Sequence, residues 1–336
     1  MPGTDVVTTS PARDQVPAAA GPEVARLAAA AAAYADASMA SNTRRAYQSD
    51  WRDFSSWCEA RHLTPLPASA DVVALYLTDR AGALKVSTLE RKLAAIRAAH
   101  RRSDLPTPAS AALDEIWSGI RRTHGRPPDQ KRALLTDDLK RVIRRLPPGP
   151  AALRDKALLL LGFAGALRRS ELAALELDAG AGIRGPLRVR FVPEGLEILI
   201  DRSKADQDGE GAVIGVPAGR TALCPVQALR AWLDEARIAT GPIFRPIDRH
   251  GRLANRAMSG AAASEVVKRA CARAKVDPDL IGGHSLRSGL VTQAILNDVA
   301  VPTIMQQTRH ARVETVNRYV RVADRFRKNA AAKVGL

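Results

Sequence analysis

The chain has 336 residues, of which 46% are hydrophobic, and this length favours two domains with buried cores over one. Its formal net charge of +16 favours a polyanionic partner such as a nucleic acid. Its three cysteines lack the spacing of a metal site or a disulfide framework, and no apolar run is long enough to cross a bilayer. The sequence therefore argues against a membrane protein or a disulfide-stabilised secreted protein, and it predicts a cytoplasmic one.

The first ordered element is expected near residue 41. Residues 1–38 are rich in alanine, proline and glycine, and they predict a disordered N-terminal tail with a fraying helix over residues 23–35. After the capping residues Ser41, Asn42 and Thr43, aromatic side chains follow at helical spacing: Tyr47, Trp51, Phe54 and Trp57. These residues predict a helix with one buried aromatic face.

Three more helices complete a small helical domain over residues 39–124. Ser69 or Asp71 opens one helix, and Ser87 with Thr88 opens the next. The residues expected to face inward in the three helices are Val72, Leu75 and Tyr76, then Leu89, Leu93 and Ile96, then Leu113, Ile116, Trp117 and Ile120.

A larger second domain is predicted over residues 136–325, after a polar, proline-bearing linker at residues 125–135. It is mainly helical, but its pattern changes to three short β-rich runs: residues 187–192, 196–200 and 212–216. Alternation and intervening turn residues predict that these runs form a small antiparallel sheet. Residues 326–336 are expected to be a C-terminal tail. The predicted fold is therefore mainly α with a small antiparallel β-sheet, in two domains.

Two polar positions in the second domain are consistent with ordinary structure when each is taken alone. Arg168 follows an apolar helix, and Glu171 lies three residues later, so the two form an ordinary helical ion pair. Lys204 lies in a polar turn, where a surface lysine is common.

A third group lies nearer the C-terminus. His284 and Arg287 follow two glycines and share one face of a predicted helix start, where exposed amides favour an anion. His310 and Tyr319 come next, although a single tyrosine near a C-terminus usually contributes only packing.

Taken together, these side chains resemble the tyrosine recombinase or phage integrase family. The resemblance covers residues 136–325 and rests on residues in a fixed order: Arg168, Lys204, His284, Arg287, His310 and Tyr319. Residues 39–124, most clearly residues 100–105, are similar to the Cre type of this family. The resemblance implies a two-domain clamp, in which a helical, SAM-like core DNA-binding domain precedes the catalytic domain.

The resemblance implies a site-specific recombinase that cleaves and rejoins DNA through a 3′-phosphotyrosine. Two arginines, Arg168 and Arg287, suit the nonbridging phosphate oxygens because each guanidinium makes forked hydrogen bonds. Tyr319 would be the nucleophile, and it needs help because a free phenol titrates near pH ~10. Because arginine and lysine supply the positive charge, no metal or other cofactor is implied.

Four further roles follow from the resemblance alone. His284 would help to take the Tyr319 proton, and Lys204 would protonate the leaving 5′ oxygen. His310 would donate a hydrogen bond to the phosphate, and Glu171 would orient Arg168 from behind.

The resemblance also implies a double-stranded DNA recombination site held by a homotetramer on two such sites. The candidate DNA-binding residues are Thr43, Arg45, Ser87, Arg91, Lys92 and Arg256. A solvated basic face is the alternative for those near residue 90, and helix capping is the alternative for those near residue 43. The C-terminal tail is expected to dock on a neighbouring subunit, with a frayed end as the alternative.

One departure from the family concerns the turn before His310. The family usually has Leu-Gly there, whereas this chain has Thr308 and Arg309. Arg309 is expected either to contact the DNA backbone or to distort the turn. A DNA-binding regulator that no longer cuts and a type IB topoisomerase are the rival interpretations. The choice among an integrase, a plasmid resolvase and a chromosome-dimer resolver stays open.

Overall fold

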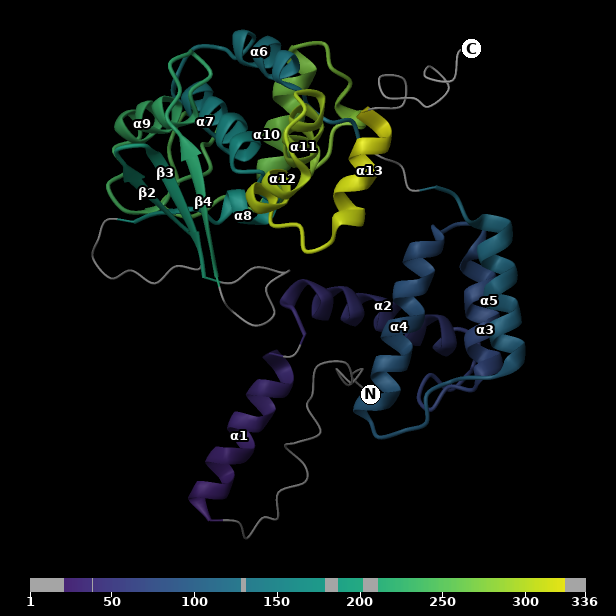
Figure 1. Ribbon diagram of the computed structural model, residues 1–336. Helices are drawn as coiled ribbons and strands as arrows, with labels where there is room; N and C mark the ends of the chain where they lie inside the picture. The colour runs from purple at the N-terminus through teal and green to yellow at the C-terminus, as the bar shows by residue number, and fades with distance from the viewer. Residues whose placement is uncertain (1–20, 38, 128–130, 179–186, 202–210, 324–336) are drawn as a thin grey trace, which may run out of the picture. The chain divides into compact units, whose positions relative to one another are not determined.

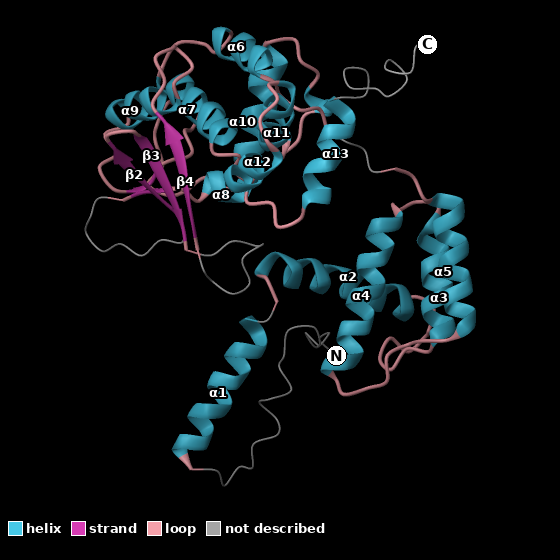
Figure 2. Ribbon diagram, viewed as in Figure 1, coloured by secondary structure: helices cyan, strands magenta, loops and turns pink. Residues whose placement is uncertain are grey.

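The computed structural model describes residues 21–37, 39–127, 131–178, 187–201 and 211–323. The chain divides into two compact units, Met1–Asp129 and Gln130–Leu336 (Figure 1). Both units are mainly helical, and the strands belong to the second unit (Figure 2). Within the described ranges, no helix is long and apolar enough to cross a membrane.

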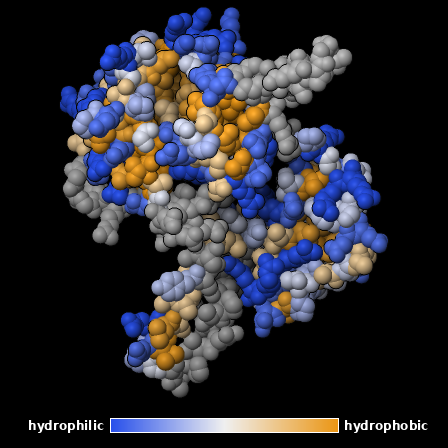
Figure 3. Space-filling view, viewed as in Figure 1, coloured by the Kyte–Doolittle hydropathy of each residue, from blue (hydrophilic) through white to orange (hydrophobic). Residues whose placement is uncertain are grey.

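The first unit is helical throughout its regular structure. Its helices are α1 (Pro22–Ala37), α2 (Ser41–Glu59), α3 (Ala70–Ala81), α4 (Val86–Arg102) and α5 (Ala111–His124). Part of the expected N-terminal tail is therefore helical, over a slightly longer range than the fraying helix predicted there. Helix α1 carries exposed hydrophobic side chains, orange in Figure 3, with Val24 and Leu27 exposed by 48% and 57%.

The aromatic face of α2 forms the core of the first unit, as its spacing predicts. Phe54 and Tyr76 are fully buried and meet edge to face, with ring centroids 5.0 Å apart. Two inward predictions are wrong, because Leu75 and Ile116 are exposed by 59% and 39%. In α3 the buried positions include Leu77 instead.

His100, at the C-terminal end of α4, is a structural residue. It is fully buried, and its Nε2 accepts a hydrogen bond from the Ala68 amide at 2.9 Å. Its Nδ1 lies 2.8 Å from the Ile96 carbonyl oxygen, so Nδ1 carries the proton. The imidazole thereby joins α4 to the segment that precedes α3.

The second unit combines helices with one small sheet. Its helices are α6 (Thr136–Arg144), α7 (Pro150–Ala164), α8 (Arg169–Ala173), α9 (Pro225–Glu235), α10 (Gly260–Arg273), the 3-10 helix η2 (Pro278–Leu280), α11 (Ser285–Leu296), α12 (Val301–Thr308) and α13 (Val313–Ala323). Its strands are β1 (Glu176–Leu177), β2 (Leu187–Val192), β3 (Gly195–Ile200), β4 (Ala212–Pro217) and β5 (Gly241–Pro242).

The sheet is mixed rather than purely antiparallel. The three predicted strands are confirmed as β2, β3 and β4, and they pair antiparallel in the order β4-β3-β2. Beyond them, β1 pairs parallel with β2 and antiparallel with β5. Helix α7, which runs through the core, packs against α9, and both lie beside the strands in Figure 2.

The end of the predicted linker belongs to the second unit. The Arg132 amide donates to the Leu280 carbonyl at 2.7 Å, and the Leu134 amide donates to the Ser285 carbonyl at 3.0 Å. Leu134 is fully buried in the core. Residues 131–135 are therefore held by main-chain hydrogen bonds to η2 and to the start of α11.

Candidate active site

The first part of the site lies where α7 ends and α8 begins. Arg168 is the N-cap residue of α8, and Glu171 lies in the first turn of that helix. The Glu171 carboxylate accepts the Arg168 amide at 2.9 Å and the Arg168 Nη1 at 2.6 Å. The predicted pairing is thus present, and Glu171 holds both the backbone and the guanidinium of Arg168.

The second part comes from the N-terminus of α11. His284 is the N-cap residue, and Arg287 follows in the first turn with only 4% exposure. Arg287 Nη1 donates to the Ala166 carbonyl at 2.7 Å, and its Nη2 donates to the Thr308 carbonyl. A buried guanidinium therefore joins the end of α7, the start of α11 and the end of α12.

The approach of α11 to the chain before α6 depends on a glycine. A Cβ at Gly289 would lie 2.0 Å from the Leu134 carbonyl oxygen, far inside van der Waals contact. Only glycine fits there without displacing backbone, which is why α11 can place Arg287 so deeply.

The third part is the turn after α12, which carries His310. The buried Thr308 hydroxyl lies 2.7 Å from the Ile304 carbonyl oxygen and 2.8 Å from His310 Nδ1. The hydroxyl has one hydrogen. When it donates to Ile304, Nδ1 must carry the imidazole proton, and Nε2 of the neutral ring is an acceptor. When it turns to Nδ1, Nε2 carries the proton and can donate.

Arg309 lies in the same turn, and its side chain is largely buried. Its backbone is left-handed, with φ 57° and ψ 45°, and it ends α12. Its side chain is 10% exposed and reaches Glu171, with Nη2 2.8 Å from Oε2 and Nη1 3.4 Å from Oε1. The side chain is thus engaged by a carboxylate of the protein itself, and the contact with the DNA backbone expected for it stays a prediction.

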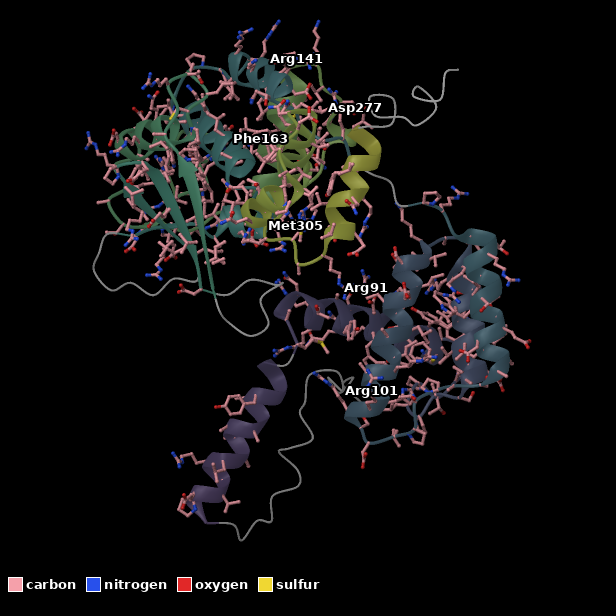
Figure 4. The ribbon with its side chains drawn as sticks, in the orientation of Figure 1. Arg91, Arg101, Arg141, Phe163, Asp277 and Met305 are labelled. Atoms are coloured by element: carbon pink, nitrogen blue, oxygen red, sulfur yellow. The ribbon has the colours of Figure 1, made fainter. Side chains whose placement is uncertain are left out.

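Tyr319 lies on α13, which packs against α11 and α12. It is partly buried against a small apolar cluster made of Val291, Ile295, Ile304 and Val316. Met305 of α12, labelled in Figure 4, packs against the same cluster. The cluster therefore fixes the helix that carries Tyr319 onto the two helices that carry Arg287 and the His310 turn.

The electrostatics connect these three parts. Burial lowers the pKa of Arg287 to about 10, and the charges of Arg168 and Arg309 act in the same direction, whereas Glu171 and Tyr319 oppose it. Each of these groups is thus close enough to act on the same guanidinium. The unit presents several positive charges around one carboxylate, which is an arrangement that attracts an anion.

Both histidines are held neutral by the same surroundings. Burial, together with Arg287, Arg168 and Arg309, lowers the pKa of His310 to about 4. Partial burial, Arg287 and Arg168 likewise lower the pKa of His284 below its ordinary value. At neutral pH, both rings are therefore uncharged.

Burial alone would raise the pKa of Glu171. The hydrogen bond and charge of Arg309, together with the hydrogen bonds from Arg168, outweigh it, so the pKa lies below its ordinary value and Glu171 is ionised. Of the six predicted catalytic residues, Lys204 lies outside the described residues. The other five lie in the second unit, on or beside α8, α11, α12 and α13.

Comparison with known proteins identifies the family. Residues 132–325 match the model of the phage integrase family, and residues 34–102 match the phage integrase N-terminal SAM-like domain. The chain belongs to the phage integrase family of tyrosine recombinases. These enzymes cleave and rejoin DNA.

Individual relatives agree with this assignment. An integrase/recombinase xerD homolog of Selenomonas ruminantium is 38% identical over 87% of this chain and 85% of its own. The recombinase Cre of Escherichia phage P1 is 25% identical over 81% of this chain and 82% of its own. The Cre-like pattern is thus a true relationship, although identity to the xerD homolog is higher.

The fold agrees as well. A XerH recombinase bound to its difH substrate has a TM-score of 0.57 at 16% identity, covering 79% of this chain and 72% of that one. A lambda integrase dimer bound to a core site has a TM-score of 0.55 at 16% identity, covering 87% and 92%.

In this recombinase, the candidate DNA-binding residues of α4 differ in their surroundings. Ser87 and Arg91 are exposed, and Arg91, labelled in Figure 4, is paired with Asp50 at 2.7 Å. Lys92 requires a correction, because it is 7% exposed and its Nζ lies 2.7 Å from Asp53 and 3.3 Å from Asp50. Its ammonium is held inside the unit and is not presented to a groove.

The remaining candidates lie at the surface. Arg45 is exposed and donates to the Asn42 side chain at 2.5 Å, whereas Thr43 is partly buried in the first turn of α2. Arg256 is exposed in the segment before Ser259, the N-cap residue of α10, rather than inside the helix start.

Sequence reasoning missed two kinds of partner. One is backbone: the Ala166 and Thr308 carbonyls that hold Arg287 have no signature in the sequence. The other is Asp50 and Asp53 of α2, which hold the basic residues of α4. The two aspartates lie three residues apart, so they share one helical face with the aromatic stripe, and this signal could have indicated a buried polar network.

Proposed function

We propose that this tyrosine recombinase cuts one strand of a double-stranded DNA site by attack of Tyr319 on the scissile phosphate. The Tyr319 oxygen bonds to phosphorus, and the bond from phosphorus to the 5′ oxygen breaks. The phenol proton passes toward His284, and Lys204 gives a proton to the 5′ oxygen. A 5′-hydroxyl of a second duplex then attacks the 3′-phosphotyrosine and restores tyrosine, so strand exchange needs no external energy source.

The observation that carries this proposal is the convergence of charge on the unit that holds Tyr319. Arg287 contacts the carbonyl of Ala166, which is 121 residues away and close to Arg168. Preorganised positive groups that face developing negative charge are usually the largest catalytic contribution to such a reaction. Arg168 and Arg287 supply the forked donors, and His310 supplies a hydrogen bond when its Nε2 carries the proton.

The DNA contacts and the assembly belong to the same proposal. Arg91 and Ser87 would face the major groove from α4, and Arg256 would contact DNA from the second unit. Thr43 and Arg45 would contact DNA from the start of α2. The active form would be a homotetramer on two DNA sites, acting in the cytoplasm. Solved relatives support this, since one is a lambda integrase tetramer bound to a Holliday junction.

The test is covalent capture on DNA. The substrate is a nicked suicide duplex built from inverted repeats in the DNA that flanks the gene. Wild-type protein should form a covalent adduct that survives denaturation, whereas Tyr319→Phe should form none. An adduct with Tyr319→Phe would show that another residue is the nucleophile.

The assignment of Lys204 is tested separately. Lys204→Ala should cleave ordinary DNA slowly but should recover on a duplex whose leaving 5′ oxygen is replaced by sulfur, because a thiolate leaves without a proton donor. The absence of such recovery would remove Lys204 from the role of general acid.

A further inference from the structure

Arg309 occupies a backbone position that suits glycine. Its φ of 57° is left-handed, a conformation in which the Cβ of an L-residue is crowded. Its amide donates to the Met305 carbonyl at 2.7 Å and closes the end of α12. An arginine at this position therefore carries a conformational cost that the family's usual glycine avoids, and the side chain must compensate for it.

The side chain compensates by pairing with Glu171. The residues are 138 positions apart, and the Arg309 Nη2 lies 2.8 Å from Glu171 Oε2. Glu171 already accepts two hydrogen bonds from Arg168, one from its amide and one from its guanidinium. With the longer contact of Arg309 Nη1 at 3.4 Å, one carboxylate accepts four hydrogen bonds and has no free acceptor position.

This sharing changes the charge that Arg168 presents. If Glu171 bound Arg168 alone, the two charges would cancel within the pair. Because Arg309 shares the carboxylate, the three side chains together keep one positive charge, and Arg287 adds a second beside them. Arg309 is 10% exposed, and its buried Nε has no hydrogen-bond partner among the described residues. Uncompensated positive charge in such a place favours binding of an anion.

We propose that Arg309 is a positioning residue that acts through Glu171. It restrains the carboxylate so that Arg168 keeps one orientation toward the scissile phosphate and keeps its charge available for it. The proposal rests on the proposed function, in which Arg168 binds that phosphate. It assigns to Arg309 no contact with DNA.

The test measures the single-turnover rate of adduct formation at saturating protein, on the suicide duplex that captures Tyr319. Arg309→Gly should slow adduct formation about tenfold or more, because small displacements of a catalytic group are costly. Its thermal unfolding should stay close to that of wild type, since glycine relieves the left-handed backbone. Arg309→Lys, which keeps the charge but not the fork, should recover only part of the rate.

A double-mutant cycle with Glu171→Gln tests whether Arg309 acts through Glu171 or independently of it. If Arg309 acts through Glu171, adding Arg309→Gly to Glu171→Gln should slow the reaction little further. Multiplying effects would overturn the proposal. The proposal would also be overturned if Arg309→Gly changed the slope of the logarithm of DNA affinity against the logarithm of salt concentration by about 0.9, because that change reports one lost phosphate contact.

The control separates this inference from the proposed function. An Arg309→Gly protein that cleaves at the wild-type rate, beside a wild-type adduct that needs Tyr319, overturns the role of Arg309 alone. A wild-type protein whose adduct does not need Tyr319 overturns the proposed function, and the role of Arg309 with it.

Discussion

His310 should be neutral throughout the physiological pH range when no DNA is bound, and this makes the second unit sensitive to acid. Its pKa of about 4 in the folded protein lies below the ~6.5 of an unfolded chain. Between these values the unfolded chain binds more protons than the folded one. The contribution of this pKa shift to the free energy of unfolding is therefore fully present above pH ~6.5 and is lost as the pH falls toward 4.

The size of the effect follows from the two values. Moving from about pH 7.5 to about pH 5 should cost the wild-type unit about 1 kcal/mol through His310 alone, because solvent screening at this half-buried ring reduces the roughly 2 kcal/mol that the two pKa values give. His310→Gln keeps a polar side chain that does not titrate, so it should lack this loss. The pKa of His284 is also lowered, so His284 adds a loss of unfolding free energy at low pH. This loss is the same in the wild type and in His310→Gln, and it cancels when the two proteins are compared.

The assay is urea unfolding at both pH values, and unfolding is monitored by amide hydrogen exchange in peptides from α11. This readout reports the second unit separately, which matters because a two-unit chain need not unfold in one step. Equal losses in the wild type and His310→Gln would refute the reasoning. A His310 ring that titrates near pH ~6.5 by nuclear magnetic resonance would refute it too.

Three further substitutions test other parts of the structure. Thr308→Val should destabilise the second unit by about 1 kcal/mol in urea unfolding, because it leaves the partly buried His310 Nδ1 without its partner, whereas Thr308→Ser should not. Lys92→Met should destabilise the first unit by about 1–3 kcal/mol, because buried Asp50 loses one of its two cationic partners and keeps only Arg91, and a change in DNA sequence preference at unchanged stability would contradict this placement. Gly289→Ala should lower the melting temperature strongly, because its Cβ meets the Leu134 carbonyl at 2.0 Å, and a variant as stable as wild type would show that α11 can move away.

The sequence predicted the type and the buried face of an element best where one clear repeating pattern spans the element. The aromatic stripe of α2 and the alternation in β2, β3 and β4 are examples. Strands β1 and β5 were missed because two residues carry no period. Leu75 was misplaced because α3 contains apolar residues on several sides, so spacing alone does not identify its buried face.

Lys92 shows how a rule about charge can override a pattern that was correct. It lies three residues after Leu89 and four before Ile96, so its spacing places it on the buried stripe. Its charge suggested the surface, but aspartates from α2 supply the partners that burial requires. The only sequence signal for those partners lies on another helix, where Asp50 and Asp53 share a face with the aromatic stripe of α2, and it does not say which basic residue they hold.

The sequence points to the predicted catalytic residues more directly than to the groups that hold them in place. Each of the five that the structure describes is a side chain with a family motif around it. Their supports are long-range contacts, such as Arg309 with Glu171, which are 138 residues apart, and main-chain carbonyls that any residue supplies. The local sequence around a residue predicts neither its long-range contacts nor its hydrogen bonds to main-chain carbonyls.

The anchoring of Arg287 to the carbonyls of Ala166 and Thr308 has a consequence for the cell that makes this enzyme. A chain still emerging from the ribosome holds Arg168 long before the segment with Arg287 exists, and Arg287 has its second anchor only once α12 is complete. Contacts of such long sequence separation also require the closure of a long loop before they can form, which slows folding. A chain that ends before α12 lacks the Thr308 carbonyl, so both anchors of Arg287 are present only after almost the whole second unit has been synthesised.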